Sequence, residues 1–194
     1  MKEIRYGLRI GFIGEKGLIR EIFLEKLSKF ALESEFSDED YIFKILFKQI
    51  PIKIKVFIAE TFENLLYKVN KIKKLDIIII TVNLHKIESL NNLNRKLIDD
   101  FNSQFLFNGL SVLVGMDLEQ IFQKILSKKY KISRFQLEKI AKDLNLIYCY
   151  EVFNKNKDID EIFDKLLNDF IIRFQYSNRD LFEKAKEYGK RLIS

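Results

Sequence analysis

Hydrophobic positions along the chain follow two spacings in turn, one typical of strands and one of helices. Six short segments are continuously apolar or alternate with polar residues, which predicts strands. They are residues 9–13, 41–50, 52–59, 76–82, 110–114 and 146–152. Seven longer segments repeat apolar residues three and four positions apart, which predicts amphipathic helices. They are residues 18–30, 61–74, 89–105, 119–129, 133–144, 160–174 and 180–193.

Three parts of the sequence give further detail about the expected sheet. Residues 77–82 read IIIITV, a continuous apolar run of the kind that is buried on both faces of a parallel sheet. Residues 41–50 and 52–59 are expected to pair antiparallel around Pro51, and the alternation IKIKVFI in the second gives it one wet face. Residues 33–40, ESEFSDED, are expected to form an acidic loop. Alternating strands and helices favour an α/β protein.

Composition sets the class of protein. The 194 residues are 47% hydrophobic, enough for one domain with a full core. Lys and Arg number 34 against 28 Asp and Glu, so the net charge is only +6, and the two signs are interspersed. This pattern favours solubility over a nucleic-acid footprint. The basic clusters at residues 68–74 and 128–131 are interpreted as solvated helix ends, with nucleic acid or an anionic lipid surface as alternatives.

Single residues bound the chemistry further. Cys149 is the only cysteine, so an internal disulfide is impossible, and we expect a buried thiol in a reducing compartment. The opening MKEIRYGLRI lacks the apolar segment of a secretory leader, and the longest apolar run is far shorter than a membrane helix. We therefore expect a cytoplasmic protein without a transmembrane segment. His85, the only histidine, is expected to be a polar loop residue rather than an acid or base.

The order of elements and four stretches resemble the Ras-like small GTPase family. The stretches are RIGFIGEKGLIREIFLEKL, LDIIIITVNLHKIESLNNLNRKLIDDF, LSVLVGMDL and AKDLNLIYCYEVFNKNKDIDEIFDKLL. The resemblance implies a Ras-like P-loop NTPase fold, with about six strands in a mostly parallel sheet and helices on both faces. It also implies a small-GTPase-like domain over residues 1–175. Residues 176–194 then form an additional amphipathic helix, which we expect to pack on the same domain.

The family's phosphate loop, G-x-x-x-x-G-K-[ST], is degenerate in this chain. Gly14 stands at the first glycine, but Ile19 falls at the second, where a β-branched side chain would be strained if the position required a positive φ. Arg20 falls at the lysine and keeps its charge. Glu21 falls at the Ser/Thr that would bind Mg²⁺, and brings negative charge beside the phosphate site.

Three further motifs of the family are degenerate as well. In the phosphate loop, Lys16 and Gly17 would remain as an alternative cradle for a phosphate. In the D-x-x-G motif, Ile58 stands at the aspartate and Thr61 at the glycine. In N-K-x-D, Met116 stands at the asparagine, and Asp117 or Glu119 at the aspartate. At the positions of the S-A-K loop, this chain has Val152, Phe153 and Asn154 instead.

These departures lead us to expect a pseudo-GTPase, which keeps the fold without a nucleotide, a metal ion or a catalytic residue. By analogy with the family, it would bind protein partners through the surface of residues 33–61. One alternative is an atypical GTPase that holds GTP or GDP and Mg²⁺ with Lys16, Arg20 and Glu21 or Asp117 in altered roles. A second alternative is a basic adaptor for nucleic acid.

Overall fold

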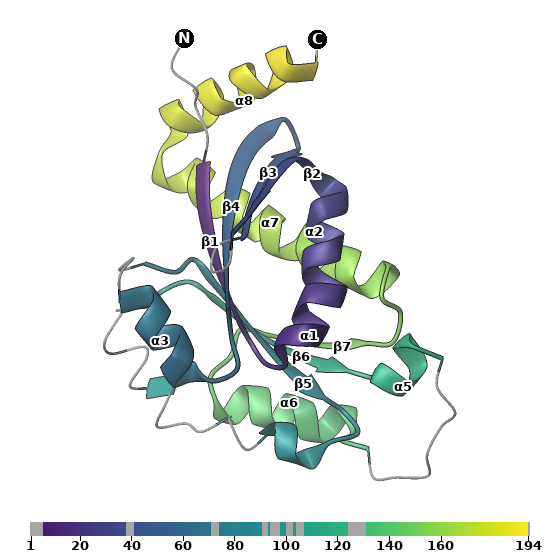
Figure 1. Ribbon diagram of the computed structural model, residues 1–194. Coiled ribbons are helices and arrows are strands. Elements are labelled where there is room, and N and C mark those ends of the chain that lie inside the picture. Colours follow the sequence, from purple (N-terminus) through teal and green to yellow (C-terminus); the bar gives the residue numbers. More distant parts are fainter. Residues whose placement is uncertain are drawn as a thin grey trace.

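The computed structural model has an α/β fold (Figure 1). The structure describes residues 6–37, 41–70, 74–90, 93, 98–99, 103, 107–123 and 131–193. The strands are β1 (Tyr6–Ile13), β2 (Ala31–Phe36), β3 (Tyr41–Phe47), β4 (Ile50–Ala59), β5 (Ile77–Asn83), β6 (Leu110–Met116) and β7 (Tyr148–Val152). The helical segments are α1 (Lys16–Ile19), the π-helical η1 (Arg20–Leu24), α2 (Glu25–Phe30), α3 (Phe62–Asn70), the 3₁₀ turn η2 (Ile87–Leu90), α5 (Leu118–Ile121), α6 (Arg134–Asp143), α7 (Lys157–Ser177) and α8 (Arg179–Ile193).

The described strands form one sheet of seven in the order β2-β3-β4-β1-β5-β6-β7. β1 pairs parallel with β4 and β5, and the parallel pairing continues through β6 to β7. β3 and β4 form the expected antiparallel pair. The chain reverses at Lys48 and Gln49, which both have positive φ, and Pro51 lies inside the pairing opposite Leu46. The sheet is therefore mostly parallel, with an antiparallel end.

The seventh strand corrects the expected acidic loop. Residues 33–36 belong to β2, which pairs antiparallel with β3 at the edge of the sheet. Glu33 and Glu35 both form ion pairs with Lys44 of β3, and the distance from Lys44 Nζ to Glu35 Oε1 is 3.2 Å. An edge strand needs little burial, so the hydrophobic pattern of this segment gives no strand signal. Residues 38–40, the rest of the expected loop, lie outside the described residues.

Helices cover both faces of the sheet, as expected. On one face the continuous helix α1–η1–α2 packs with α7 and α8 through side chains such as Ile22, Phe23 and Phe163. On the other face α3 and α6 pack through Phe62 and Leu137. Figure 1 shows α2 and α3 on opposite sides of the strands. The predicted helices at residues 89–105 and 119–129 lie largely outside the described residues.

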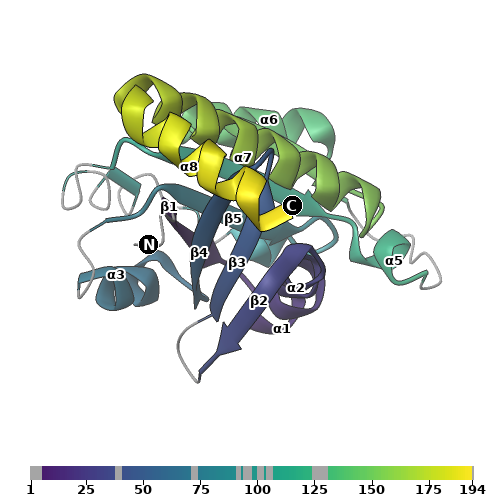
Figure 2. The same ribbon diagram turned by 90° about the horizontal axis from the view of Figure 1, so that it is seen from above.

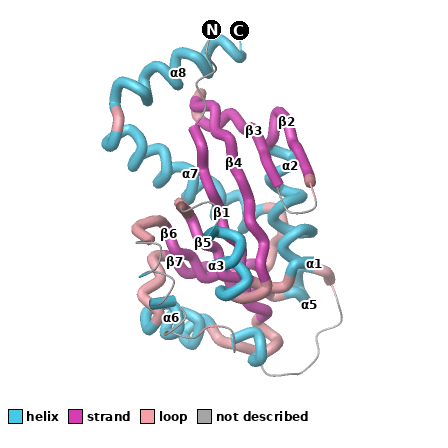
Figure 3. The backbone as a smooth tube through the Cα atoms, turned by 60° about the vertical axis from the view of Figure 1, so that its left-hand side comes forward, coloured by secondary structure: helices cyan, strands magenta, loops and turns pink. Residues whose placement is uncertain are grey.

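The last helix, α8, lies against the turn between β3 and β4 (Figure 3). Phe182 and Ala185 are buried in the same core cluster as α7. A Cβ atom added to Gly189 would overlap the carbonyl oxygen of Gln49, so the helix backbone touches the turn directly. Within the described residues, no helix is both long enough and apolar enough to pass through a bilayer.

Candidate functional site

A pocket of about 320 Å³ opens at the carboxyl ends of three parallel strands. Gly14 follows β1, Thr81 and Asn83 come from the end of β5, and Met116 ends β6. Ligands of open α/β sheets bind at this edge, where the strand ends and the following loops converge. It is also the edge to which the sequence assigns the degenerate phosphate loop and base-recognition residues. The pocket is therefore the place to test those assignments.

Gly14 is held by the protein itself. Its backbone N–H donates to the carbonyl oxygen of Ala59 at 3.0 Å, and its φ of 143° is a conformation that favours glycine. An added Cβ would overlap Thr81 Oγ1, and this hydroxyl donates to the carbonyl oxygen of Ile13 at 3.0 Å. Packing against Thr81 is thus sufficient to require a glycine at the first position of the expected phosphate loop.

The connection from β1 to the next helix is too short for the expected loop. β1 ends at Ile13 and α1 begins at Lys16, which leaves only Gly14 and Glu15 between them. Lys16 and Gly17 are helical, so the shifted cradle that they were expected to offer does not form. Ile19 is fully buried and has ordinary helical dihedrals, φ −60° and ψ −45°, so the expected strain is absent. It is a core residue on the first turns of a helix.

Of the charged side chains at the start of this helix, Lys16 reaches the edge of the pocket, whereas Arg20 contacts Tyr41 and Glu21 is exposed. The Arg20 guanidinium lies 5.7 Å from the ring centre of Tyr41 in β3. Lys16 Nζ lies 3.8 Å from Glu60 Oε1. The positions assigned to the lysine and the Mg²⁺ ligand therefore play neither role in this arrangement.

The pocket itself carries the wrong sign for a phosphate. Its lining includes the carboxylates of Glu15, Glu60 and Glu88 and the ammonium group of Lys86. With Lys16, which lies beside Glu60, two cations face three carboxylates. A phosphate needs backbone N–H groups or cations around it, and carboxylates beside it repel. Among the described residues, no three His, Cys, Asp or Glu side chains are arranged to hold a metal ion.

The residues at the D-x-x-G positions have structural roles. Ile58 is buried in β4, and its carbonyl oxygen accepts a hydrogen bond from Lys68 Nζ at 3.1 Å. Thr61 Oγ1 accepts from the Asn64 N–H at 3.2 Å, as a residue that precedes a helix does. The nearby Phe62 is also buried. This segment ends a strand and starts α3. Neither Ile58 nor Thr61 offers a carboxylate, and the one between them, Glu60, is paired with Lys16.

On the other side of the pocket, Asp117 is the centre of a polar cluster (residues His85, Asp117 and Lys131). Asp117 is 3% exposed. Its Oδ2 accepts from Lys131 Nζ at 2.7 Å, and its Oδ1 lies 3.1 Å from His85 Nε2 and accepts from the Gln120 N–H at 3.0 Å. Burial raises the pKa of the Asp117 carboxyl, but the hydrogen bonds from Lys131, Gln120 and His85 outweigh it and leave the pKa below its ordinary value. A carboxylate that would grip a base edge is thus already satisfied internally.

The remaining residues that the sequence assigned to base recognition also have structural contacts. Met116 is buried at the end of β6. The ring of Phe153 lies under Lys131 Nζ, 4.8 Å from the ring centre, and its backbone N–H donates to Asp158 Oδ2 at 2.7 Å. Asn154 N–H donates to the same oxygen at 2.8 Å. The last loop is therefore held by Asp158 and does not point free donors at the pocket.

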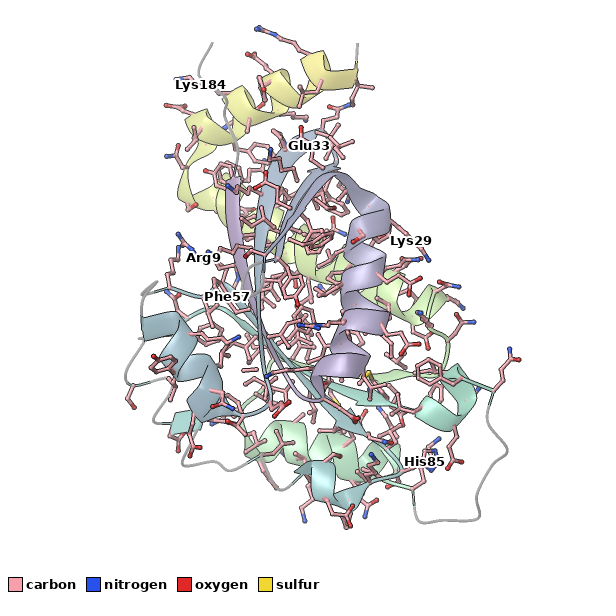
Figure 4. All side chains as sticks on the ribbon, viewed as in Figure 1. Arg9, Lys29, Glu33, Phe57, His85 and Lys184 are labelled. Atoms are coloured by element: carbon pink, nitrogen blue, oxygen red, sulfur yellow. The ribbon has the colours of Figure 1, made fainter. Side chains whose placement is uncertain are left out.

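Sequence reasoning missed the polar cluster. His85 was expected to be a polar loop residue, but its side chain is mostly buried beside Asp117. Its Nδ1 has no hydrogen-bond partner in the described part of the chain and lies 3.9 Å from Glu119 Oε1. Figure 4 shows His85 at the end of the molecule opposite α8. The segments NLHK (residues 83–86) and GMD (residues 115–117) stand at the ends of two predicted strands. Because parallel strands end at the same edge of a sheet, these positions could have predicted that His85 and Asp117 lie close together.

Two other expectations need correction. Lys131 was assigned to a solvated basic cluster, but it donates to Asp117. Cys149 is half-buried rather than buried, and burial is the largest of the causes that raise the pKa of its thiol. Neither residue lines the pocket.

Neither a protein-family model nor a curated protein sequence matches the chain. The site therefore has to be interpreted from its own geometry. That geometry brings Gly14 and Met116 together at the pocket, with Asp117 beside it, and takes Arg20, Ile58 and Thr61 into structural contacts.

Proposed function

We propose that this protein is a pseudo-GTPase with a Ras-like fold, and that it acts as a non-enzymatic protein-interaction module or subunit. The order of its described elements supports the fold, since it matches the expected order apart from the edge strand β2. One observation carries the functional proposal. The connection from β1 to the helix consists of only Gly14 and Glu15, and Thr81 occupies the space that a side chain at position 14 would need.

Both halves of a nucleotide would meet unfavourable contacts in this pocket. On the phosphate side, the lining supplies more carboxylates than cations. On the base side, the Asp117 carboxylate would have to give up Lys131 and His85 before it could bind a guanine. Leaving the mostly buried His85 unpaired costs about 1–3 kcal/mol, whereas the partly exposed Lys131 can be solvated. Residual GTP or GDP binding with Mg²⁺ would therefore need a rearrangement of both sides.

The lysines of the two basic clusters support a protein partner over nucleic acid. Lys68 donates to the Ile58 carbonyl oxygen, and Lys131 donates to Asp117. Lys74 Nζ lies 3.4 Å from Asp76 Oδ1. These described members of the clusters make intramolecular contacts, whereas phosphate binding draws its affinity from cations that release counterions. The proposed contact surface remains residues 33–61, which span β2, β3 and β4.

Ligand-dependent melting tests the proposal. The melting temperature is measured with 1 mM GTP, GDP or ATP, with and without Mg²⁺, and with tripolyphosphate as the control for plain anion binding. We expect changes within 1 °C for all of them. A functional site with a Kd near 10 μM would add about 2.7 kcal/mol at this ligand excess, which is roughly 5–10 °C for a domain of this size. A Mg²⁺-dependent rise of that size with one nucleotide would contradict the proposal.

Salt-dependent binding tests the nucleic-acid alternative separately. Anisotropy of a labelled 20-nucleotide single strand and of a duplex is followed between about 50 and 200 mM NaCl. We expect no saturable binding at micromolar protein. Binding whose log K falls linearly with log salt would instead favour the basic adaptor.

A further inference from the structure

The two edge strands of the sheet, β7 and β2, differ in how far they are covered by the rest of the protein. At one edge, Tyr148 and Tyr150 of β7 are half-buried, and Arg134 Nη2 from α6 donates to the Cys149 carbonyl oxygen at 3.3 Å. At the other edge, five of the six residues of β2 are exposed, and Leu32 and Phe36 keep 65% and 60% of their surface in contact with solvent. Figures 2 and 3 show β2 at the outer side of the sheet. Proteins usually blunt such an edge, because its unpaired N–H and C=O groups accept another strand.

The side chains of β2 divide between two faces. Glu33 and Glu35 lie on the face of Lys44, and both form ion pairs with it. Phe36 lies on the opposite face, with its ring centre 5.7 Å from that of Phe43 and 6.1 Å from that of Tyr41. A strand added beside β2 would therefore have one face next to carboxylates and the other next to aromatic rings.

Charge complementarity indicates what such a strand must carry. Glu33, Glu35 and Lys44 sum to a formal net charge of −1. The sequence segment ESEFSDED contains five acidic residues and no basic one, although the whole chain carries +6. Opposite charges directly across a strand pair stabilise it, and like charges destabilise it. A basic residue at alternate positions is the complement of this edge.

In two of its registers, pairing with a second copy of the chain is unfavourable. Antiparallel pairing centred on Ser34 would place Glu33 of one copy opposite Glu35 of the other. A shift by one residue would set the charged face of one strand beside the apolar face of its partner. Either register loses what a stable strand pair needs.

We infer that the outer edge of β2 binds an extended segment of a different protein, with Lys or Arg at alternate positions and apolar residues between them. This rests on the proposed role as an interaction module and specifies how that module binds. The backbone groups of β2 provide affinity, and Glu33, Glu35 and Phe36 select the alternating pattern.

A peptide with alternating Lys and Val residues is the probe. Its binding to the full chain is measured by fluorescence anisotropy, beside a peptide of the same composition with the lysines in one block and the valines in another. We expect the alternating peptide to bind at least tenfold more tightly than the block peptide. The double variant Glu33→Lys with Glu35→Lys should weaken it at least tenfold, and should gain affinity for an alternating Glu and Val peptide.

The matched control carries the same charge change elsewhere. Glu161→Lys with Glu183→Lys alters exposed residues of α7 and α8 and should leave the affinity within twofold. Melting of every variant checks that it is folded, and Glu33→Gln with Glu35→Gln replaces the lysine pair if that one unfolds. Equal binding of the two lysine peptides, or an equal loss in the control variant, would overturn the inference by showing bulk electrostatics only.

Two further measurements separate this inference from its rivals. Sedimentation of the full chain tests self-association, and a dimer abolished by the Glu33→Lys and Glu35→Lys variant would overturn the choice of a different protein as partner. The nucleotide melting experiment is run on the same samples. Peptide binding together with nucleotide binding would refute the pseudo-GTPase proposal and leave the edge intact, whereas neither kind of binding would refute the edge alone.

Discussion

The two sides of the strand-end pocket are closed by different physical means. On the Gly14 side, closure is steric: Thr81 packs against a glycine with a φ of 143°, and the helix begins two residues later. On the Asp117 side, closure is electrostatic, because a buried carboxylate is held by Lys131, His85 and the Gln120 amide. The Gly14 side leaves no space for added atoms at position 14, and on the Asp117 side the carboxylate already has its hydrogen-bond donors.

The difference matters for stability and for reversibility. A steric closure does not depend on pH or salt, and opening it requires the backbone to move. A closure by charges changes with protonation, and a ligand that replaces each hydrogen bond could in principle exchange with it. We therefore expect substitutions on the Gly14 side to cost more and to respond less to solution conditions than those on the Asp117 side.

The largest effect is expected from Gly14→Ala. The added Cβ overlaps Thr81 Oγ1, and alanine is strained at this φ. We expect the free energy of unfolding to fall by about 3–5 kcal/mol, measured by urea denaturation. Gly17→Ala is the matched control, since it is helical and its Cβ would meet no atom within 4 Å. It should be neutral or raise stability by about 0.5–1 kcal/mol.

The Gly14 prediction has a direct check on its cause. In the background of Thr81→Ala, the obstructing hydroxyl is absent, so part of the cost of Gly14→Ala should disappear, while the φ strain remains. A Gly14→Ala variant as stable as the parent would show that the backbone relaxes freely, and that the Gly14 side of the pocket is not closed by steric overlap.

On the electrostatic side, Asp117→Ala should have the next largest effect. It leaves Lys131 and His85 without their carboxylate and removes the cap of the Gln120 N–H. We expect a loss of about 2–4 kcal/mol, read from the same denaturation curves. Asp164→Ala, on the exposed side of α7, is the control and should stay within about 0.5 kcal/mol. Equal effects of the two would mean that the polar cluster contributes nothing specific.

Much of the fold followed from the sequence because it depends on long periodic segments. The IIIITV run predicted the buried strand β5, and the helical spacing of residues 160–174 predicted α7. The edge strand β2 was missed, because its residues face solvent and its glutamates pair with Lys44 of the neighbouring strand β3. Hydrophobic patterning detects burial, so an exposed strand at an edge gives it no signal.

The site was harder to predict than the fold. Aligning the chain with a phosphate-loop pattern placed Ile19 at a loop glycine, whereas the helix starts earlier, at Lys16, and buries Ile19. A motif alignment assumes a loop of fixed length, and a shortened loop breaks that assumption. The pairing of Asp117 with Lys131 joins residues from separate elements, and no local pattern contains that information.

Acid should weaken the electrostatic side selectively. The folded pKa of Asp117 lies below its unfolded value, so the carboxylate contributes stability above the unfolded pKa, and this contribution is lost as pH falls through the folded pKa. The stability difference between the parent and Asp117→Asn should therefore be constant above pH 5 and shrink below about pH 4. Urea denaturation of both proteins from pH 7 to pH 2.5 measures it. A stability difference that does not change with pH would show that the ionisation of Asp117 does not contribute to the stability of the cluster.

The smallest effect is expected from Lys131→Met. Methionine keeps an apolar chain over the ring of Phe153 but removes the ammonium group that donates to Asp117. Because Asp117 keeps Gln120 and His85 as partners, and the Lys131 side chain is partly exposed, the loss should be only about 1 kcal/mol. Lys139→Met, on the exposed side of α6, should change stability by less than about 0.5 kcal/mol. If Lys131→Met cost as much as Asp117→Ala, the lysine would be the dominant partner and the cluster a simple buried ion pair. If it cost no more than the control, the carboxylate would be held by His85 and the Gln120 amide alone, and a cationic ligand could take the place of Lys131 at little expense.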